Sequence, residues 1–254
     1  MIRVLLLSLW WIPALIHFIF FNSSNTNWNN ILKAPQFTHF YTIAGYDSFG
    51  RPLLFQLFDA SIYSLLFTAI AVTSIVLLST VNAMLLLNEK NFFSKSIHTM
   101  NHFFISFPSL LIALCLSTFF ESGALLLLTS ICLGTVPLTS RFIFVHLKKI
   151  LNREYYISGK SLGQTQWGFF QFYFFPEIVQ LIKLKLPQLF AGTLIAESTF
   201  TFLGIGSPLG SLTWGSLFLE GKDYLLEAPH IAIATGLPLI WTLVILYRWN
   251  KKEF

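Results

Sequence analysis

The stretch ASIYSLLFTAIAVTSIVLLSTVNAMLLLN, residues 60–88, carries no charged side chain. A helix that crosses the hydrocarbon core of a bilayer needs about 20 predominantly apolar residues. Further charge-free windows occur at residues 4–32, 96–120, 122–140, 198–219 and 228–247. Backbone polar groups cannot stay unpaired in lipid, so such windows must form helices unless they close a barrel. The alternating segments of about ten residues that barrel strands show are not found. The sequence therefore predicts an all-α polytopic membrane protein.

Composition supports the same class. Of 254 residues, 55% are hydrophobic and only 11% are charged, against about 25% in ordinary soluble domains. We expect one domain, residues 1–254, with about six transmembrane helices near residues 4–21, 62–87, 102–120, 123–140, 187–207 and 229–247. The first apolar run could also be a signal peptide. Its length, and the lack of a small-x-small cleavage site before residues 22–25, favour a retained span.

The distribution of basic residues predicts the orientation. With the N-terminus inside, six spans return the C-terminus to the cytoplasm, and only Lys33, Arg51 and Lys222 of the 16 Lys and Arg residues fall outside. This is the bias expected of cytoplasmic segments. The net charge of +5 then reflects topology, and no nucleic-acid partner is needed to explain it.

Several kinds of chemistry are not indicated. The chain has no G-x-x-x-x-G-K-[ST] phosphate loop and no recognisable Ser/His/Asp arrangement, so we expect neither an enzyme nor a bound cofactor. His98 and His102 are spaced i, i+4, as zinc ligands can be, but no acidic third ligand lies nearby in the sequence. We therefore expect no metal site.

Glu197 is the acidic residue that stands out within a predicted span. A charge at mid-bilayer costs roughly 2.5–3.5 kcal/mol on insertion scales, so this side chain should face protein or water. Thr193, Glu197 and Thr201 recur at i, i+4 and i+8 and share one helix face. Gly192 and Ala196 beside them suit close helix contact. Two roles stay open for Glu197: an acid that lines or gates a pathway, and a buried acid bonded to neighbouring helices.

Residues 141–186 form the one large cytoplasmic segment of this topology. The lysines near its two ends could simply lie among anionic lipid headgroups. That explanation does not cover the small residues of 158–163, which would let a short helix approach another protein. Gly163 is a plausible helix terminator, and Pro176 predicts a second break.

The same segment resembles the EAA loop of ABC importer permeases, in which a Gly is followed thirteen residues later by a Pro, as Gly163 is by Pro176. It departs from that loop where Ile157 takes the Glu position and Ser158 and Gly159 take the two Ala positions. Further motifs resemble the C-type permease subunit of the dipeptide/oligopeptide/nickel family: GYDSFGR at 45–51, REY at 153–155, ESTFTFLGIG at 197–206, TWG at 213–215 and EGKDY at 220–224.

This resemblance implies an ABC type I importer-like permease with a cytoplasmic coupling helix in the loop at about 141–186. Coupling to an ATPase would involve Arg153, Glu154, Ser158, Gly159, Lys160, Gly163 and Pro176. The implied partners are a second homologous permease, two cytoplasmic ATPase subunits that bind ATP and Mg, and an extracytoplasmic substrate-binding protein, in a bacterial inner membrane. Peptides are the first substrate class implied, and nickel or another chelated metal the next. The competing hypothesis is a secondary transporter or channel that uses Glu197 as an ion or proton site.

Overall fold

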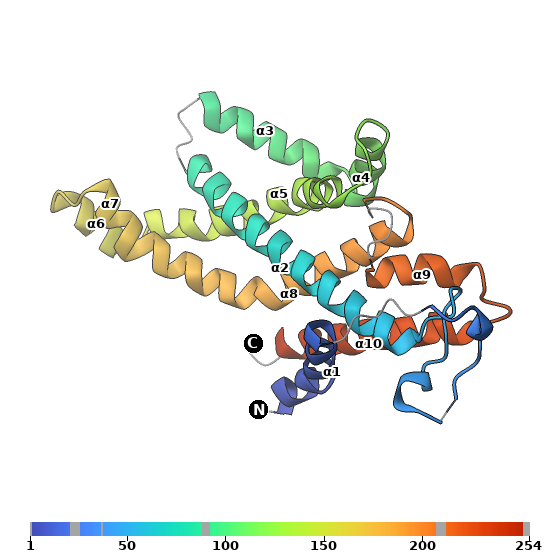
Figure 1. Cartoon of the computed structure of the whole chain (residues 1–254). Helices are drawn as coiled ribbons and strands as arrows, with labels where there is room; N and C mark the ends of the chain where they lie inside the picture. Colours follow the sequence, from blue (N-terminus) through green and yellow to red (C-terminus); the bar gives the residue numbers. More distant parts are fainter. Residues whose placement is uncertain (1, 21–25, 37, 88–91, 207–211, 251–254) are drawn as a thin grey trace.

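The computed structural model of the protein describes residues 2–20, 26–36, 38–87, 92–206 and 212–250 (Figure 1). Within these ranges the regular elements are helical and no strand is formed; Tyr46 and Pro52 make a single isolated bridge. The prediction of an all-α protein is confirmed.

The helices differ widely in length. The longest are α1 (Ile2–Phe20), α2 (Leu53–Leu86), α5 (Ala124–Leu151), α8 (Phe175–Phe202) and α10 (Pro229–Asn250). The shorter ones are α3 (Phe92–Ser106), α4 (Ser109–Ser117), α6 (Glu154–Ser161), α7 (Gln166–Phe169) and α9 (Trp214–Lys222). Two short turns, η1 (Trp28–Asn30) and η2 (Phe40–Thr42), precede α2, and the π-helical turn η3 (Phe170–Phe174) joins α7 to α8.

Among the described residues, four helices are long and apolar enough to cross a membrane: α2, α5, the Trp167–Phe202 run that contains α8, and Pro229–Arg248 of α10. The pair α3 and α4 would make a fifth, but it is bent by 94°. Helix α1 is 19 residues long, and its stretch Trp10–Phe20 is apolar. The predicted span at 102–120 is therefore not one continuous helix, because the helix is broken between Ser106 and Ser109. Pro108 lies at the bend with an extended backbone, because a proline offers no N–H to continue the helix.

Three helices extend beyond the predicted spans. Helix α2 begins at Leu53 instead of 62, α5 continues to Leu151 instead of ending at 140, and α8 begins at Phe175 instead of 187. Charged residues ended the predicted spans, but a helix can continue beyond the hydrocarbon layer. Pro187 lies inside α8, which agrees with the tolerance of proline in membrane helices. The predicted loop at 141–186 is consequently mostly helical.

Two further predicted loops are partly helical. The inner turn at 88–101 includes residues 88–91, which lie outside the described part, and its remainder belongs to α3. The outer segment at 208–228 includes 208–211, also outside the described part, and its remainder contains α9.

Helix α2 lies at the centre of the molecule and packs against α1, α5 and α8 (Figure 1). Its buried face carries small residues, among them Ala60, Ser64 and Ala71, which allow helices to approach closely. The Ser79 hydroxyl donates to the carbonyl oxygen of Val136 in α5 at 3.3 Å. Helices α6 and α7 lie at one end of this bundle, and α9 with residues 38–52 lies towards the other (Figure 1).

Candidate functional site

The first candidate site is the α6 tip, which we define as residues 153–167 at the end of α5. Arg153 takes the N-cap position of α6 with an extended backbone. Glu154 follows in the first turn and Lys160 lies in the last, so both charges complement the helix dipole. Gly163 has φ +78, a left-handed conformation that L side chains rarely adopt, and α6 ends immediately before it. The prediction of a helix terminator at Gly163 is confirmed.

The α6 tip is fixed to the rest of the chain by aromatic side chains. The rings of Tyr155 and Tyr173 stack with centroids 5.3 Å apart, and Tyr156 contacts Phe169 at 4.5 Å. Gly159 is buried beneath this cluster, and a Cβ there would lie 3.2 Å from the Tyr173 hydroxyl. The expectation that Gly159 allows close approach to another protein therefore needs correction, because its close contact is with its own chain.

Three large apolar side chains of the α6 tip are more than half exposed. Leu162 is 87% exposed, Trp167 70% and Ile157 55%. Exposed apolar groups gathered at one place on a protein indicate an interaction surface. Ser158 and Lys160 are exposed beside them.

Pro176 does not break the chain as predicted. It lies in the first turn of α8, where proline is well tolerated, and η3 leads into it without interruption. Pro176 is exposed and belongs to α8, outside the α6 tip as defined above.

The second candidate site is a polar joint, formed by Ser64 of α2, Glu197 and Ser198 of α8, and Thr213 before α9. The Glu197 side chain is 0% exposed. Its carboxylate accepts hydrogen bonds from the Ser64 hydroxyl at 3.4 Å and from the Ser198 hydroxyl at 3.2 Å. The Ser64 hydroxyl in turn accepts from the backbone N–H of Trp214 at 3.2 Å. Glu197 therefore links three elements that are distant in sequence.

Gly215 lets α9 lie directly against α8. A Cβ at this position would overlap the Thr201 hydroxyl and the Ser198 carbonyl oxygen. Trp214 beside it is completely buried. Helices α8 and α9 therefore cannot separate without exposing the polar joint.

Thr193, Glu197 and Thr201 are all buried, which places them on one covered face of α8 as their spacing predicts. The Thr201 hydroxyl donates to the Glu197 carbonyl oxygen at 2.9 Å. Gly192 behaves differently from its prediction, since it is exposed and a Cβ there would meet nothing within 4 Å. It makes no close helix contact within the described part of this chain.

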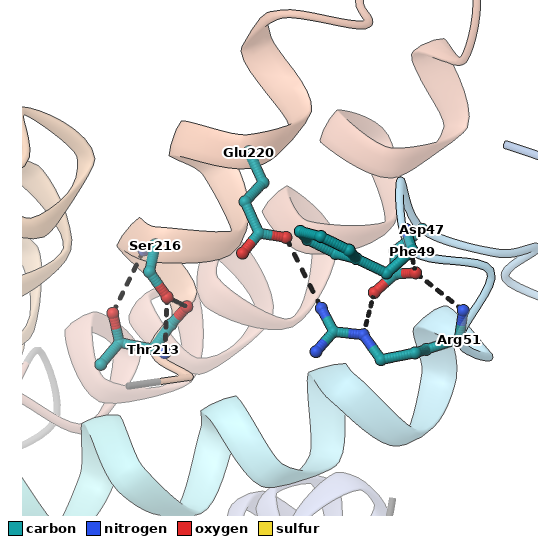
Figure 2. A network of polar contacts seen from close by, with 6 residues as sticks. All are labelled: Asp47, Phe49, Arg51, Thr213, Ser216 and Glu220. Atoms are coloured by element: carbon teal, nitrogen blue, oxygen red, sulfur yellow. Dashed lines mark hydrogen bonds and ion pairs between the residues drawn. The ribbon is translucent and has the colours of Figure 1, made fainter. Parts of the chain in front are cut away.

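An ionic cluster connects the predicted GYDSFGR and EGKDY motifs (Figure 2). The Asp47 carboxylate accepts from the Arg51 side chain at 2.6 Å and from the Arg51 backbone N–H at 2.8 Å. Arg51 also approaches Glu220 of α9 to 3.8 Å, an ion-pair distance too long for a hydrogen bond. Burial raises the pKa of Glu220 above its ordinary value, Arg51 opposes that rise and Asp47 adds to it. Glu220 therefore serves a contact within the chain.

The structure also reveals a buried pair that sequence reasoning missed. His17 of α1 and Asp59 of α2 lie 3.1 Å apart, and the His17 ring stacks on Phe55 with centroids 4.4 Å apart. Glu197 is thus not the only acid inside a membrane-crossing helix. Asp59 lies directly before the charge-free window at residues 60–88 and marks its boundary. The sequence signal for the pair is His17, a histidine inside the first apolar run. Within the described ranges, no group of three or more His, Cys, Asp or Glu side chains could hold a metal ion.

Comparisons with known proteins agree with the motifs. Residues 75–252 match the family described as binding-protein-dependent transport system inner membrane component. The glutathione transport system permease protein GsiD of Pectobacterium atrosepticum is 20% identical over 218 residues, which cover 86% of this chain and 71% of that protein. A putative peptide transport system permease protein of Brucella suis is 24% identical over 211 residues, 82% of this chain and 69% of that protein.

Proposed function

Since the chain belongs to the family of inner membrane components of binding-protein-dependent transport systems, we propose that it forms half of the translocation pathway of an ATP-driven peptide importer. The other half would be a second, homologous permease. Two cytoplasmic ATPase subunits would bind and hydrolyse ATP, and an extracytoplasmic binding protein would deliver the substrate. Peptides are proposed as the cargo because the similar proteins are named for glutathione and peptide transport.

The single observation that carries the coupling role is the exposed apolar surface of the α6 tip. Leu162, Trp167 and Ile157 would enter a cleft of one ATPase, while the stacked tyrosines beneath keep α6 rigidly attached to α5 and η3. A rigid attachment is needed because ATP binding can favour one state of the permease only through contacts that differ between its states. Movement of the α6 tip would then shift the spans between inward- and outward-open arrangements.

Charge supports the proposed orientation, in which both termini are cytoplasmic. The basic residues Lys148, Lys149, Arg153 and Lys160 gather at the α6 end of the molecule. At the α9 end, Asp223 and Glu227 are exposed. Basic residues are enriched on the cytoplasmic side of membrane proteins, so the α6 end faces the ATPase subunits.

A role for Glu197 as an ion or proton site has less support. Its carboxylate is enclosed by α2, α8 and the start of α9, and hydroxyl groups of the same chain donate to it. We therefore propose that Glu197 holds these helices together, and that Thr193 and Thr201 complete the same buried face.

The coupling role is tested by replacing Ile157 and Leu162 together with serine in the complete transporter. We expect the ATPase subunits to be lost on purification and ATP-dependent peptide uptake into vesicles to fall by at least tenfold, because central apolar contacts typically contribute about 2 kcal/mol or more to an interface. Leu226→Ser is the matched control, since Leu226 is fully exposed near α9, at the other end of the molecule. Retention of the ATPase subunits by the double variant would contradict the proposal.

A further inference from the structure

A cavity lies between α3 and α5, away from both the α6 tip and the polar joint. Its volume is about 170 Å³, and His98, His102 and Arg141 line it together with Phe144 and Val145. The two histidines come from α3 and the arginine from α5, and all three are exposed at the cavity. Basic groups thus meet apolar groups in one small space.

The cavity carries positive charge that the described residues do not neutralise. No carboxylate lines it, and in the described ranges no acidic side chain forms an ion pair with Arg141. A guanidinium group offers five N–H donors, and each imidazole offers at least one. An arginine inside a membrane-crossing helix requires a partner or contact with the interface. These features favour an anionic ligand with several oxygen acceptors.

A metal ion fits the same residues less well. The rings of His98 and His102 are 4.6 Å apart, which would suit two zinc ligands. The described part of the chain supplies no third histidine, cysteine or carboxylate for a complete set. The permanently charged Arg141 would also repel a cation.

The depth of the cavity indicates which anion would reach it. Arg141 follows the start of α5 at Ala124 by 17 residues, or about 25 Å at 1.5 Å per residue. The hydrocarbon core of a bilayer is about 30 Å thick. If α5 enters the layer at Ala124 and runs across it in the orientation proposed above, Arg141 lies just inside the inner boundary, where the headgroups of the cytoplasmic leaflet begin. Basic pockets between helices on this side are suited to anionic headgroups.

We propose that the cavity of His98, His102 and Arg141 binds the phosphodiester headgroup of an anionic phospholipid from the inner leaflet. The guanidinium and imidazole groups donate to the phosphate oxygens. Phe144 and Val145 provide apolar contact for the first part of an acyl chain. The inference depends on the proposed orientation and is independent of the cargo and of the ATPase contact.

The test compares lipid retention by the complete transporter in nanodiscs of phosphatidylcholine with phosphatidylglycerol. Native mass spectrometry after transfer to detergent counts the phosphatidylglycerol molecules that remain bound. We expect the wild-type protein to keep phosphatidylglycerol and Arg141→Gln, combined with His98→Gln, to reduce that retention by about tenfold. Lys149→Gln is the matched control, because it removes an exposed positive charge from the same helix without touching the cavity.

The outcomes separate the site from its alternatives. Equal retention by the wild-type and the double variant would overturn the proposal. Equal losses in Lys149→Gln and in the double variant would also overturn it, since general attraction to basic residues would explain them. Displacement of the bound lipid by a tripeptide would overturn it by making the cavity part of the transport pathway. Unchanged thermal unfolding midpoints exclude misfolding as the cause, and Arg141→Lys, which keeps the charge, should retain more lipid than Arg141→Gln.

Discussion

At the α6 tip, Leu162, Trp167 and Ile157 are largely exposed, whereas at the polar joint Glu197 is completely enclosed. Apolar groups thus lie outside at one place and a carboxylate lies inside at the other. The polar joint completes its hydrogen bonds within the chain. The apolar side chains of the α6 tip are not buried by the described part of this chain. Their burial against a second protein would be favourable because it removes apolar surface from water. The contrast agrees with the proposal that the polar joint preserves the shape of the subunit and that the α6 tip contacts a partner.

The sharpest way to break this contrast is Gly215→Val at the contact between α8 and α9. The added side chain would overlap the Thr201 hydroxyl and the Ser198 carbonyl oxygen, so the two helices must separate. We expect a loss of about 3 kcal/mol or more in the free energy of unfolding, at the upper end of overpacking effects. Thermal unfolding of the purified subunit measures this loss. Gly192→Val is the control, because a Cβ there meets no atom within 4 Å, and an unchanged midpoint for Gly215→Val would refute the close contact.

The next largest effect concerns Glu197 itself. Glu197→Ala leaves a space and removes the acceptor of the Ser64 and Ser198 hydroxyls, so we expect a loss of about 2–3 kcal/mol in the free energy of unfolding. Glu197→Gln keeps the size and one acceptor oxygen, and it should retain most of the stability and the uptake of peptide. Uptake assays in proteoliposomes distinguish the two roles. Normal stability with abolished transport in Glu197→Gln would show that the charge is needed for an ion site.

A smaller effect should follow from the titration of Glu220. Its pKa in the folded protein lies above the ordinary value of 4.5 because burial disfavours the charged form. As pH rises from about 4.5 through the raised pKa, the folded state holds more protons than the unfolded state, so the free energy of unfolding falls. Glu220→Gln should flatten this part of the pH profile of the thermal midpoint. The side chain is 38% exposed, so solvent screening keeps the change small. An identical slope in the variant would contradict the assignment.

The smallest change in stability is expected for Leu162→Ser, a substitution that should nevertheless change function strongly. Leu162→Ser alters a side chain that is 87% exposed, so the free energy of unfolding of the isolated subunit should stay within about 0.5 kcal/mol of the wild-type value. Binding of the ATPase subunits should nevertheless weaken, as measured by pull-down with the purified ATPase. Destabilisation of the isolated subunit comparable to that of Gly215→Val would show that Leu162 supports the fold and not a partner.

The sequence was sufficient for features that depend on local composition. Charge-free windows predicted the helices, and Gly163 predicted the end of α6 because a left-handed residue stops a helix wherever it occurs. The boundaries were less predictable. Charged residues at the ends of windows suggested that helices stop, whereas α5 continues past Arg141 to Leu151.

Features that depend on tertiary contact were not predictable. The burial of α9 rests on Gly215 lying against α8, and nothing local distinguishes this glycine from those of an exposed loop. The pairing of His17 with Asp59 joins residues 42 positions apart. Arg51 and Glu220 belong to two motifs that are far apart in the sequence. Only the folded chain shows that the two side chains lie close together (Figure 2).

The 94° elbow between α3 and α4 restricts how the subunit can be placed among its neighbours. A sharp change of direction interrupts the backbone hydrogen bonds of a helix. Acyl chains offer no donors or acceptors to the N–H and C=O groups that lose their partners. Pro108 follows Phe92, the first residue of α3, by 16 residues, or about 24 Å at 1.5 Å per residue, which is well within the hydrocarbon layer if α3 runs across it. We therefore expect the bend to face water or another protein instead of acyl chains.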